Sequence, residues 1–229
     1  MFFYYDWTII ILIPAMILSL WAQTNVNGTF RKYSKVFSRQ GYTGFDAARR
    51  ILDMNGLYNV KIERVSGNLT DHFDPKTNVV RLSDATYSNS SVGAIGVAAH
   101  EVGHAIQHAT GYAPIVIRNR IVPVVNFCNW LSMPILLIGM LFAGMNWVHF
   151  GILLFSATVI FQLITLPVEF NASRRALATL GNQAMLADDE LKGAKKVLSA
   201  AAMTYVAAAI SSIASLLRLI LIFGGRRDD

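Results

Sequence analysis

Residues 121–168 read IVPVVNFCNWLSMPILLIGMLFAGMNWVHFGILLFSATVIFQLITLPV, an almost unbroken apolar run. A single helix needs only about 20 apolar residues to cross the roughly 30 Å hydrocarbon core of a membrane. Gly144, Met145 and Asn146 lie near the middle of the run and indicate a turn there. The run therefore predicts two membrane-spanning helices that form a hairpin.

Two further apolar runs lie nearer the ends of the chain. The run from Trp7 to Ala22 has aromatic residues at both ends, as interfacial anchors do, and it lacks the basic leader and cleavage site of a signal peptide. The run from Ala200 to Phe223 is interrupted only by Arg218, and its Ala- and Ser-rich start allows packing against another helix as well as lipid exposure. With 54% apolar and 15% charged residues, the composition predicts a mainly α, polytopic membrane protein with about four transmembrane helices.

The distribution of charge predicts the orientation of the chain. Between Ala22 and Arg120 there are twelve Lys or Arg residues and seven Asp or Glu residues, whereas the turn around Asn146 carries no charge. Because cytoplasmic loops are enriched in Lys and Arg, we expect this loop to face the cytoplasm and both termini to lie outside. The same enrichment accounts for the net charge of +6 without nucleic acid, for which no binding motif is present. Cys128 is the only cysteine, so an intramolecular disulfide is excluded.

The loop is long enough for a small α+β domain that carries helix and strand patterns. We expect a helix at 43–55, with Thr43 and Asp46 in a capping box, a strand at 58–65, and a hairpin of strands 69–73 and 79–82. The predicted organisation is an N-terminal span at 1–23, a cytoplasmic α+β region at 24–118, a transmembrane hairpin at 119–168, a cytoplasmic helix at 169–199, and a C-terminal span with a short tail at 200–229.

Upstream of the hairpin, a predicted helix at 90–109 contains His100-Glu101-Val102-Gly103-His104. Two histidines four residues apart lie on one helix face, roughly 6 Å apart along the axis, and can bind one zinc ion. Glu101 is turned about 100° away, where it can accept a proton from a zinc-activated water. The motif therefore predicts hydrolysis; the alternative is a buried helix whose histidines bond to backbone or water.

Downstream of the hairpin, Glu169 is the best candidate for a third ligand. Two membrane crossings return the chain to the side on which it left His104, and an acid at a membrane border is costly without a role. Its alternative role is pairing with Arg174 or a lysine. His108 would lie about 12 Å from His100 along the helix axis, since no glycine breaks the helix, and we expect it to be a surface or supporting residue.

Three blocks of sequence carry a family resemblance. Residues 71–75, 98–114 and 166–176 closely resemble the YugP-type membrane zinc metallopeptidases of bacteria, and the match runs nearly from end to end. That family is similar to the HtpX and CAAX prenyl protease group, in which a HExxH helix and a glutamate after a transmembrane hairpin hold zinc. The resemblance implies one zinc ion per chain, the ligands His100, His104 and Glu169, and Glu101 as general base, in a multi-pass protein of the bacterial cell membrane.

The chain departs from this pattern at one position. In the HtpX group an aspartate four residues after the third ligand supports a metal-binding histidine, whereas Ser173 stands here. Asn171 and Ser173 are therefore both candidates for that supporting role.

The sequence thus predicts a membrane-embedded zinc metalloendopeptidase that acts on a protein or peptide at the cytoplasmic side of a lipid bilayer. The residues that could stabilise the oxyanion are Arg174, Arg175, His108 and His72, and we expect the substrate to lie along an edge strand at 79–82.

Two rival functions remain open. One is a zinc transporter, although four spans with hardly any acid or histidine offer a poor ion path. The other is a catalytically silent adaptor with a structural zinc, which would not need Glu101. The sequence gives no indication of oligomeric state.

Overall fold

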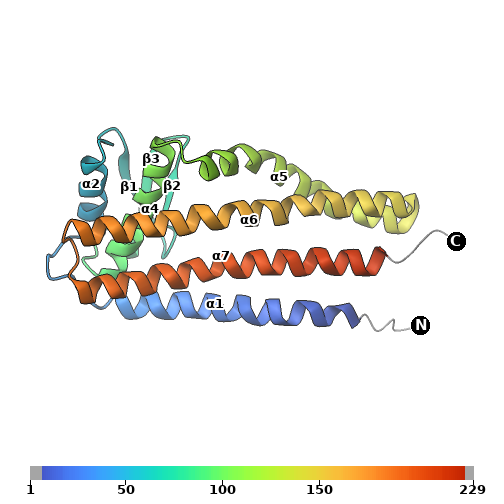
Figure 1. The fold of residues 1–229 in the computed structure, drawn as a ribbon, viewed down its shortest axis with the longest axis horizontal. Helices are drawn as coiled ribbons and strands as arrows, with labels where there is room; N and C mark the ends of the chain where they lie inside the picture. The colour runs from blue at the N-terminus through green and yellow to red at the C-terminus, as the bar shows by residue number, and fades with distance from the viewer. Residues whose placement is uncertain (1–6, 225–229) are drawn as a thin grey trace. The chain divides into compact units, whose positions relative to one another are not determined.

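The computed structural model describes residues 7–224 and is mainly helical (Figure 1). Four of its helices are long and apolar enough to cross a membrane. They are α1 (Leu12–Tyr33, continuing a short 3-10 helix at Trp7–Ile11), α5 (Ala113–Ile138), α6 (Met145–Asn182) and α7 (Asp188–Phe223). The predicted fold class, with four candidate spans and a small sheet, is confirmed.

Contacts divide the chain into two compact units. The first, which we call the apolar unit, comprises Met1–Ala22, Ile117–Leu166 and Thr204–Asp229. The second, the sheet unit, comprises Gln23–Val116 and Pro167–Met203. Helices α1, α5, α6 and α7 each contribute residues to both units, because the chain passes from one unit to the other within each helix.

In the apolar unit, the predicted hairpin turn lies where expected. Helix α5 ends in a π-helical turn at Gly139–Ala143, and Gly144 has a φ of 82°, a backbone conformation that favours glycine. The helices pack closely at Gly151, where an added Cβ would lie 2.7 Å from Leu136 Cγ. Many large apolar side chains remain exposed, for example Trp130 at 72%, as expected of a surface that faces lipid rather than water.

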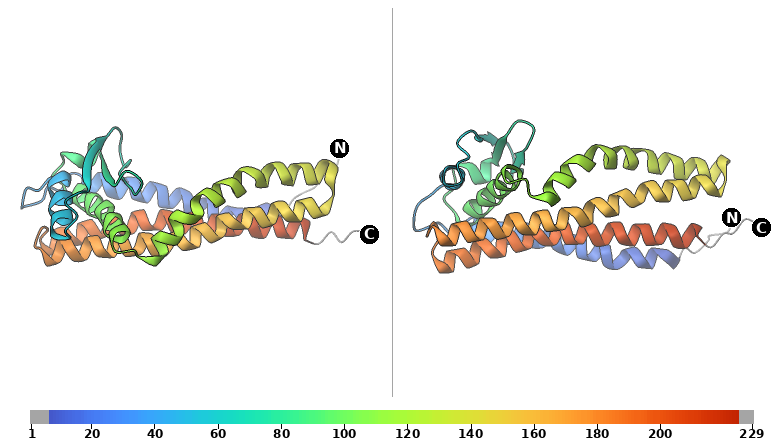
Figure 2. Two further views of the ribbon diagram at one scale, coloured as in Figure 1. Left: turned by 90° about the horizontal axis from the view of Figure 1, so that it is seen from above. Right: turned by 45° about the horizontal axis from the view of Figure 1, so that its top comes forward.

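In the sheet unit, a three-stranded sheet lies beside helix α4 (Val92–Ala109) (Figure 2). The strands are β1 (Lys61–Val65), β2 (His72–Asp74) and β3 (Val79–Ser83), in the order β1-β3-β2. Strand β3 pairs parallel to β1 and antiparallel to β2. The prediction that residues 79–82 form an edge strand is therefore wrong: β3 is central because β1 covers its second edge, and the free edges belong to β1 and β2.

Helix α2 (Gly44–Met54) begins with the predicted capping box. The Thr43 hydroxyl accepts the Asp46 N–H at 3.1 Å, and the Asp46 carboxylate accepts the Thr43 N–H at 3.0 Å. The buried face of α2, including Ile51 and Leu52, packs into a core with Val80 and Leu82 of β3 and with Ile95 and Val102 of α4. This core anchors α4 on the side of the helix that faces α2 and the sheet.

Helix α4 is enclosed by protein along most of its length. Of its 18 residues, 14 are buried. Its N-cap is Ser91, whose hydroxyl accepts the Ala94 N–H. A four-residue helix, α3 (Asp84–Tyr87), precedes α4 in the chain. At Gly103 an added Cβ would lie 2.8 Å from the carbonyl oxygen of Ala172 in α6. The lack of a side chain at Gly103 thus lets the backbones of α4 and α6 approach closely.

Candidate metal centre

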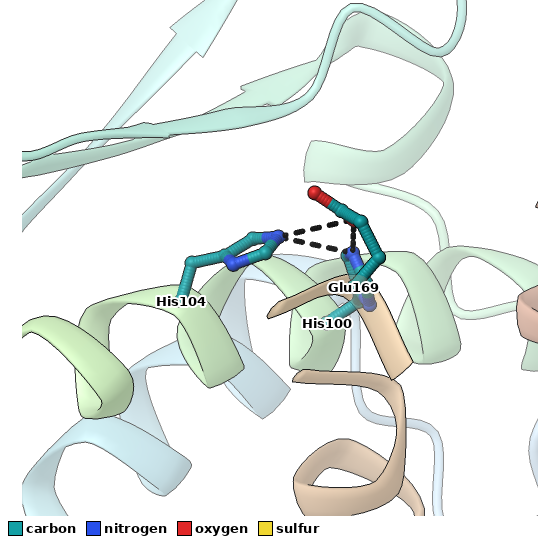
Figure 3. A group of neighbouring side chains, drawn as sticks. All are labelled: His100, His104 and Glu169. Carbon is teal, nitrogen blue, oxygen red and sulfur yellow. Dashed lines mark hydrogen bonds and ion pairs between the residues drawn. The ribbon is translucent and has the colours of Figure 1, made fainter. Parts of the chain in front are cut away.

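His100 and His104 of α4 and Glu169 of α6 converge on one point in the sheet unit (Figure 3). Their donor atoms form a triangle: the two Nε2 atoms are 3.2 Å apart, and Glu169 Oε2 lies 3.3 Å from His100 Nε2 and 3.5 Å from His104 Nε2. Ligands at 2.0–2.1 Å from a tetrahedral zinc are separated by about 3.3–3.4 Å. The donor triangle therefore has the dimensions of a zinc site, and two imidazoles with one carboxylate leave the fourth position open, as in catalytic sites.

The position of His104 is fixed by a buried amide. His104 Nδ1 lies 3.1 Å from Oε1 of Gln107, and the Gln107 amide nitrogen donates to the carbonyl of Val168 at 2.8 Å and to Oδ1 of Asn171 at 3.0 Å. Because both bonds of the Gln107 nitrogen go to acceptors, its oxygen must face His104, which then carries its proton on Nδ1. The Nε2 lone pair of His104 is thereby directed into the donor triangle.

His100 is supported by a hydroxyl instead. Ser173 Oγ lies 3.1 Å from His100 Nδ1, so one of the two candidates for this role contacts a histidine directly. The other candidate, Asn171, supports a histidine indirectly, through Gln107. Its Oδ1 accepts from the Gln107 amide and from the Arg175 guanidinium, the latter at 2.8 Å. Sequence reasoning missed Gln107, although its position three residues after His104 places it on nearly the same helix face.

Glu101 lies next to the donor triangle in sequence but takes no part in it. Its side chain is buried, and within residues 7–224 no group donates a hydrogen bond to its carboxylate. Burial raises the pKa of Glu101, and the neighbouring histidines oppose this shift. A buried carboxylate that no hydrogen bond holds is free to accept a proton.

Comparison with known proteins agrees with this geometry. Residues 8–224 match the family described as "Putative neutral zinc metallopeptidase". The chain belongs to this family. It is 52% identical to the Bacillus subtilis (strain 168) protein named "Putative membrane protease YugP" over 221 residues, which make up 96% of this chain and 98% of that protein. No solved structure matches the chain. The resemblance inferred from the three sequence blocks is thus confirmed.

The remaining candidate residues of this metallopeptidase lie outside the donor triangle. His108 is exposed, and its ring packs against Phe73 of β2 with the ring centroids 5.8 Å apart. His72 is exposed on β2, where its Nδ1 bonds the Thr70 carbonyl. Arg174 is exposed and lines a groove between α6 and α7, whereas Arg175 lies 5.9 Å from the centre of the Tyr112 ring. Of the two arginines, Arg175 is the one connected through Asn171 to the support of His104.

Proposed function

We propose that the protein is a membrane-embedded zinc metalloendopeptidase in which His100, His104 and Glu169 hold one zinc ion and Glu101 is the general base. The observation that carries the proposal is the donor triangle, whose three edges fit a tetrahedral zinc. Family membership supports the zinc and the peptidase chemistry. The deep burial of Glu169, which is 2% exposed, supports a ligand role, because such a carboxylate needs close partners.

When bound, zinc supplies a Lewis acid that lowers the pKa of a water and polarises the carbonyl of the scissile peptide. The side chains of the protein orient the histidines and transfer the proton. Gln107 and Ser173 hold the two imidazoles in orientation, so their Nε2 atoms stay directed at one point. Glu101 takes a proton from the attacking water and transfers it to the nitrogen of the leaving amine, which allows the C–N bond to break.

The substrate is proposed to bind along the free edge of β2. Strand β2 is an edge strand that contacts α4, as the packing of Phe73 on His108 shows, whereas β1 lies on the far side of β3. An extended peptide can pair with an exposed strand edge through its backbone, without regard to its sequence. This binding mode suits an endopeptidase that cuts within unfolded or extended segments.

The excess of Lys and Arg in the sheet unit supports a site that faces the cytoplasm of a bacterial cell membrane. The four candidate spans support a multi-pass protein. On this proposal, residues 24–118 and 169–199 form the cytoplasmic peptidase region, and residues 1–23, 119–168 and 200–229 anchor it.

The test measures zinc content and cleavage of an unfolded protein by the purified chain in detergent. We expect about one zinc per chain in the parent, loss of zinc in Glu169→Ala, and zinc retained with cleavage reduced roughly 10²- to 10⁴-fold in Glu101→Gln. Glu63→Gln, which changes an exposed acid of β1, is the matched control and keeps both properties. Cleavage that persists in Glu101→Gln, or zinc that binds without any cleavage by the parent, contradicts the proposal.

A further inference from the structure

A second feature of the sheet unit is a groove between α1 and α7 with a volume of about 610 Å³. Four lysines line it: Lys32 from α1, and Lys192, Lys195 and Lys196 from α7. Asn25 and Thr29 from α1 add polar groups to the same lining. The groove thus brings together ammonium and polar groups from two helices that are far apart in sequence, although the Thr29 hydroxyl itself donates to Asn25 Oδ1.

The positive charge of this groove is not neutralised by protein. Within residues 7–224, none of the four lysines forms an ion pair, and no acidic residue lines the groove. Two of the three acids at the start of α7 have partners of their own: Asp189 pairs with Arg39 at 2.6 Å, and Glu190 accepts the backbone N–H groups of Arg39 and Ala187. The third, Asp188, lines the neighbouring groove between α6 and α7 and not this one. A concave surface with four unneutralised cations attracts an anion.

The groove begins where two helices leave the apolar unit. In α1, Asn25 of the lining comes about one helical turn after Ala22, the last residue of that helix in the apolar unit. In α7, Met203 of the lining directly precedes Thr204, where the helix enters the apolar unit. Lys196 lies eight residues from Thr204, roughly 12 Å along the helix, and a lysine side chain can bend several ångströms back toward the membrane. Along α7, Lys196 is therefore the lysine of the groove nearest to the apolar segment that begins at Thr204, and Lys192, about 18 Å from it, is the farthest.

We infer that this groove binds an anionic phospholipid, with the phosphate held by the lysines of the groove and an acyl chain lying against the apolar part of its lining. A lipid fits better than a soluble phosphate because the lining combines cations with apolar surface at Tyr33, Ala200 and Met203. Basic pockets between membrane helices are suited to such headgroups. This inference does not depend on the peptidase chemistry.

The neighbouring groove between α6 and α7, of about 960 Å³, serves as an internal comparison. It shares Lys192 and Lys195 with the first groove, and it also contains Arg174. However, Asp188 lines it, and a carboxylate repels a phosphate group. The α1–α7 groove, which has four cations and no acid in its lining, is therefore the better anion site.

The test titrates the full-length protein in detergent with dioleoyl phosphatidylglycerol or dioleoyl phosphatidylcholine and counts bound lipids by native mass spectrometry. We expect the parent to retain phosphatidylglycerol well above phosphatidylcholine. The double variant Lys32→Gln/Lys196→Gln, which removes the two lysines that line this groove and not the α6–α7 groove, should bind phosphatidylglycerol roughly tenfold or more weakly. The matched control Lys61→Gln/Lys76→Gln removes the same charge from exposed lysines outside the groove and keeps the parent affinity. Melting temperature and zinc content, measured in parallel, should be unchanged in both variants.

Three outcomes overturn the inference. Equal losses in the two double variants would mean that total charge, not the groove, attracts the lipid. Equal retention of phosphatidylcholine by the parent would mean that the headgroup charge is not recognised. Displacement of phosphatidylglycerol by inorganic phosphate at equal concentration would mean that the groove binds a soluble anion without using the acyl chain.

Discussion

Helices α4 and α5 follow one another in the chain and are both apolar, yet their surroundings differ completely. In α4 the side chains of Ile95 and Val102 are fully buried by the sheet unit, whereas in α5 Val124 is 60% exposed. The lengths of the two helices also differ, since α4 has 18 residues, whereas α5 has 26 and continues into a π-helical turn. Only α5 is long enough to span a bilayer comfortably. Apolar character alone shows only that a helix avoids water. The length of the helix and the exposure of its side chains show whether protein or lipid surrounds it.

The largest expected effect comes from placing a charge on each of these helices. Val102→Asp puts an unpaired carboxylate in the core of the sheet unit and should cost roughly 4 kcal/mol or more, enough to prevent that unit from folding. Val124→Asp should instead hinder membrane insertion, at a cost of about 3 kcal/mol, and leave zinc binding intact in the inserted fraction. The measurements are the membrane-inserted fraction and the zinc content. Normal insertion of Val124→Asp would show that this face of α5 does not contact lipid.

The close approach of α4 to α6 gives the next largest effect. Gly103→Ala forces a methyl group against the Ala172 carbonyl and should cost about 1–3 kcal/mol, while it moves Glu169 away from the histidines and weakens zinc binding. Gly28→Ala is the matched control: it lies within α1, no atom lies within 4 Å of its added Cβ, and it should be neutral or slightly stabilising. Thermal unfolding and zinc titration measure both effects. An unchanged zinc affinity in Gly103→Ala would refute the spacing argument.

A smaller effect separates Gln107 and Ser173, which support the two histidines proposed as metal ligands. Gln107→Leu removes the acceptor for His104 Nδ1 and leaves the buried Val168 carbonyl without its donor, so zinc affinity should fall roughly 10- to 100-fold. Ser173→Ala should cost less, because His100 is partly exposed and water can replace the hydroxyl. Competition with a chelator measures both affinities. A larger loss in Ser173→Ala than in Gln107→Leu would reverse the assigned importance of the two supports.

The smallest effect concerns Asp74, the half-buried last residue of β2. Hydrogen bonds from the Thr77 hydroxyl, the Lys76 N–H and the Arg81 guanidinium hold the pKa of Asp74 well below its usual value. A carboxyl whose pKa is lowered by folding adds stability above its unfolded pKa of about 4, and that stability is lost as the pH falls toward the lower folded value. Asp74→Asn should therefore unfold more easily than the parent at neutral pH, and the difference should narrow in acid. The measurement is the melting temperature of both proteins as a function of pH. A difference between parent and variant that stays constant from neutral to acid pH would contradict the lowered pKa of Asp74.

Local patterns in the sequence predicted the parts of the structure that local interactions determine. The capping box of Thr43 and Asp46 involves residues three apart, and the hairpin turn at Gly144 follows from one residue type, so both could be located from the sequence. The apolar runs could also be located from the sequence, because a membrane imposes a minimum length on any helix that crosses it.

Features that depend on tertiary packing were less accessible. The edge position assigned to residues 79–82 was wrong because alternation of side chains locates a strand but does not say which strands pair with it. Gln107 was overlooked because a glutamine on a helix is usually solvated, and only the approach of Val168 and Asn171 explains its burial. Glu169 was found by counting crossings, which is a global argument, and the donor triangle includes it.

The separation of the donor residues along the chain also bears on biosynthesis. A ribosome releases His100 and His104 long before Glu169, and the whole α5–α6 hairpin must emerge in between. A nascent chain that has reached Leu166 therefore carries both histidines of the donor triangle but lacks Glu169, and it should bind zinc far more weakly than the finished chain. On the proposed function, the zinc site is therefore completed only after the hairpin has been synthesised, and chains arrested before Pro167 should reveal this timing by their weaker zinc affinity.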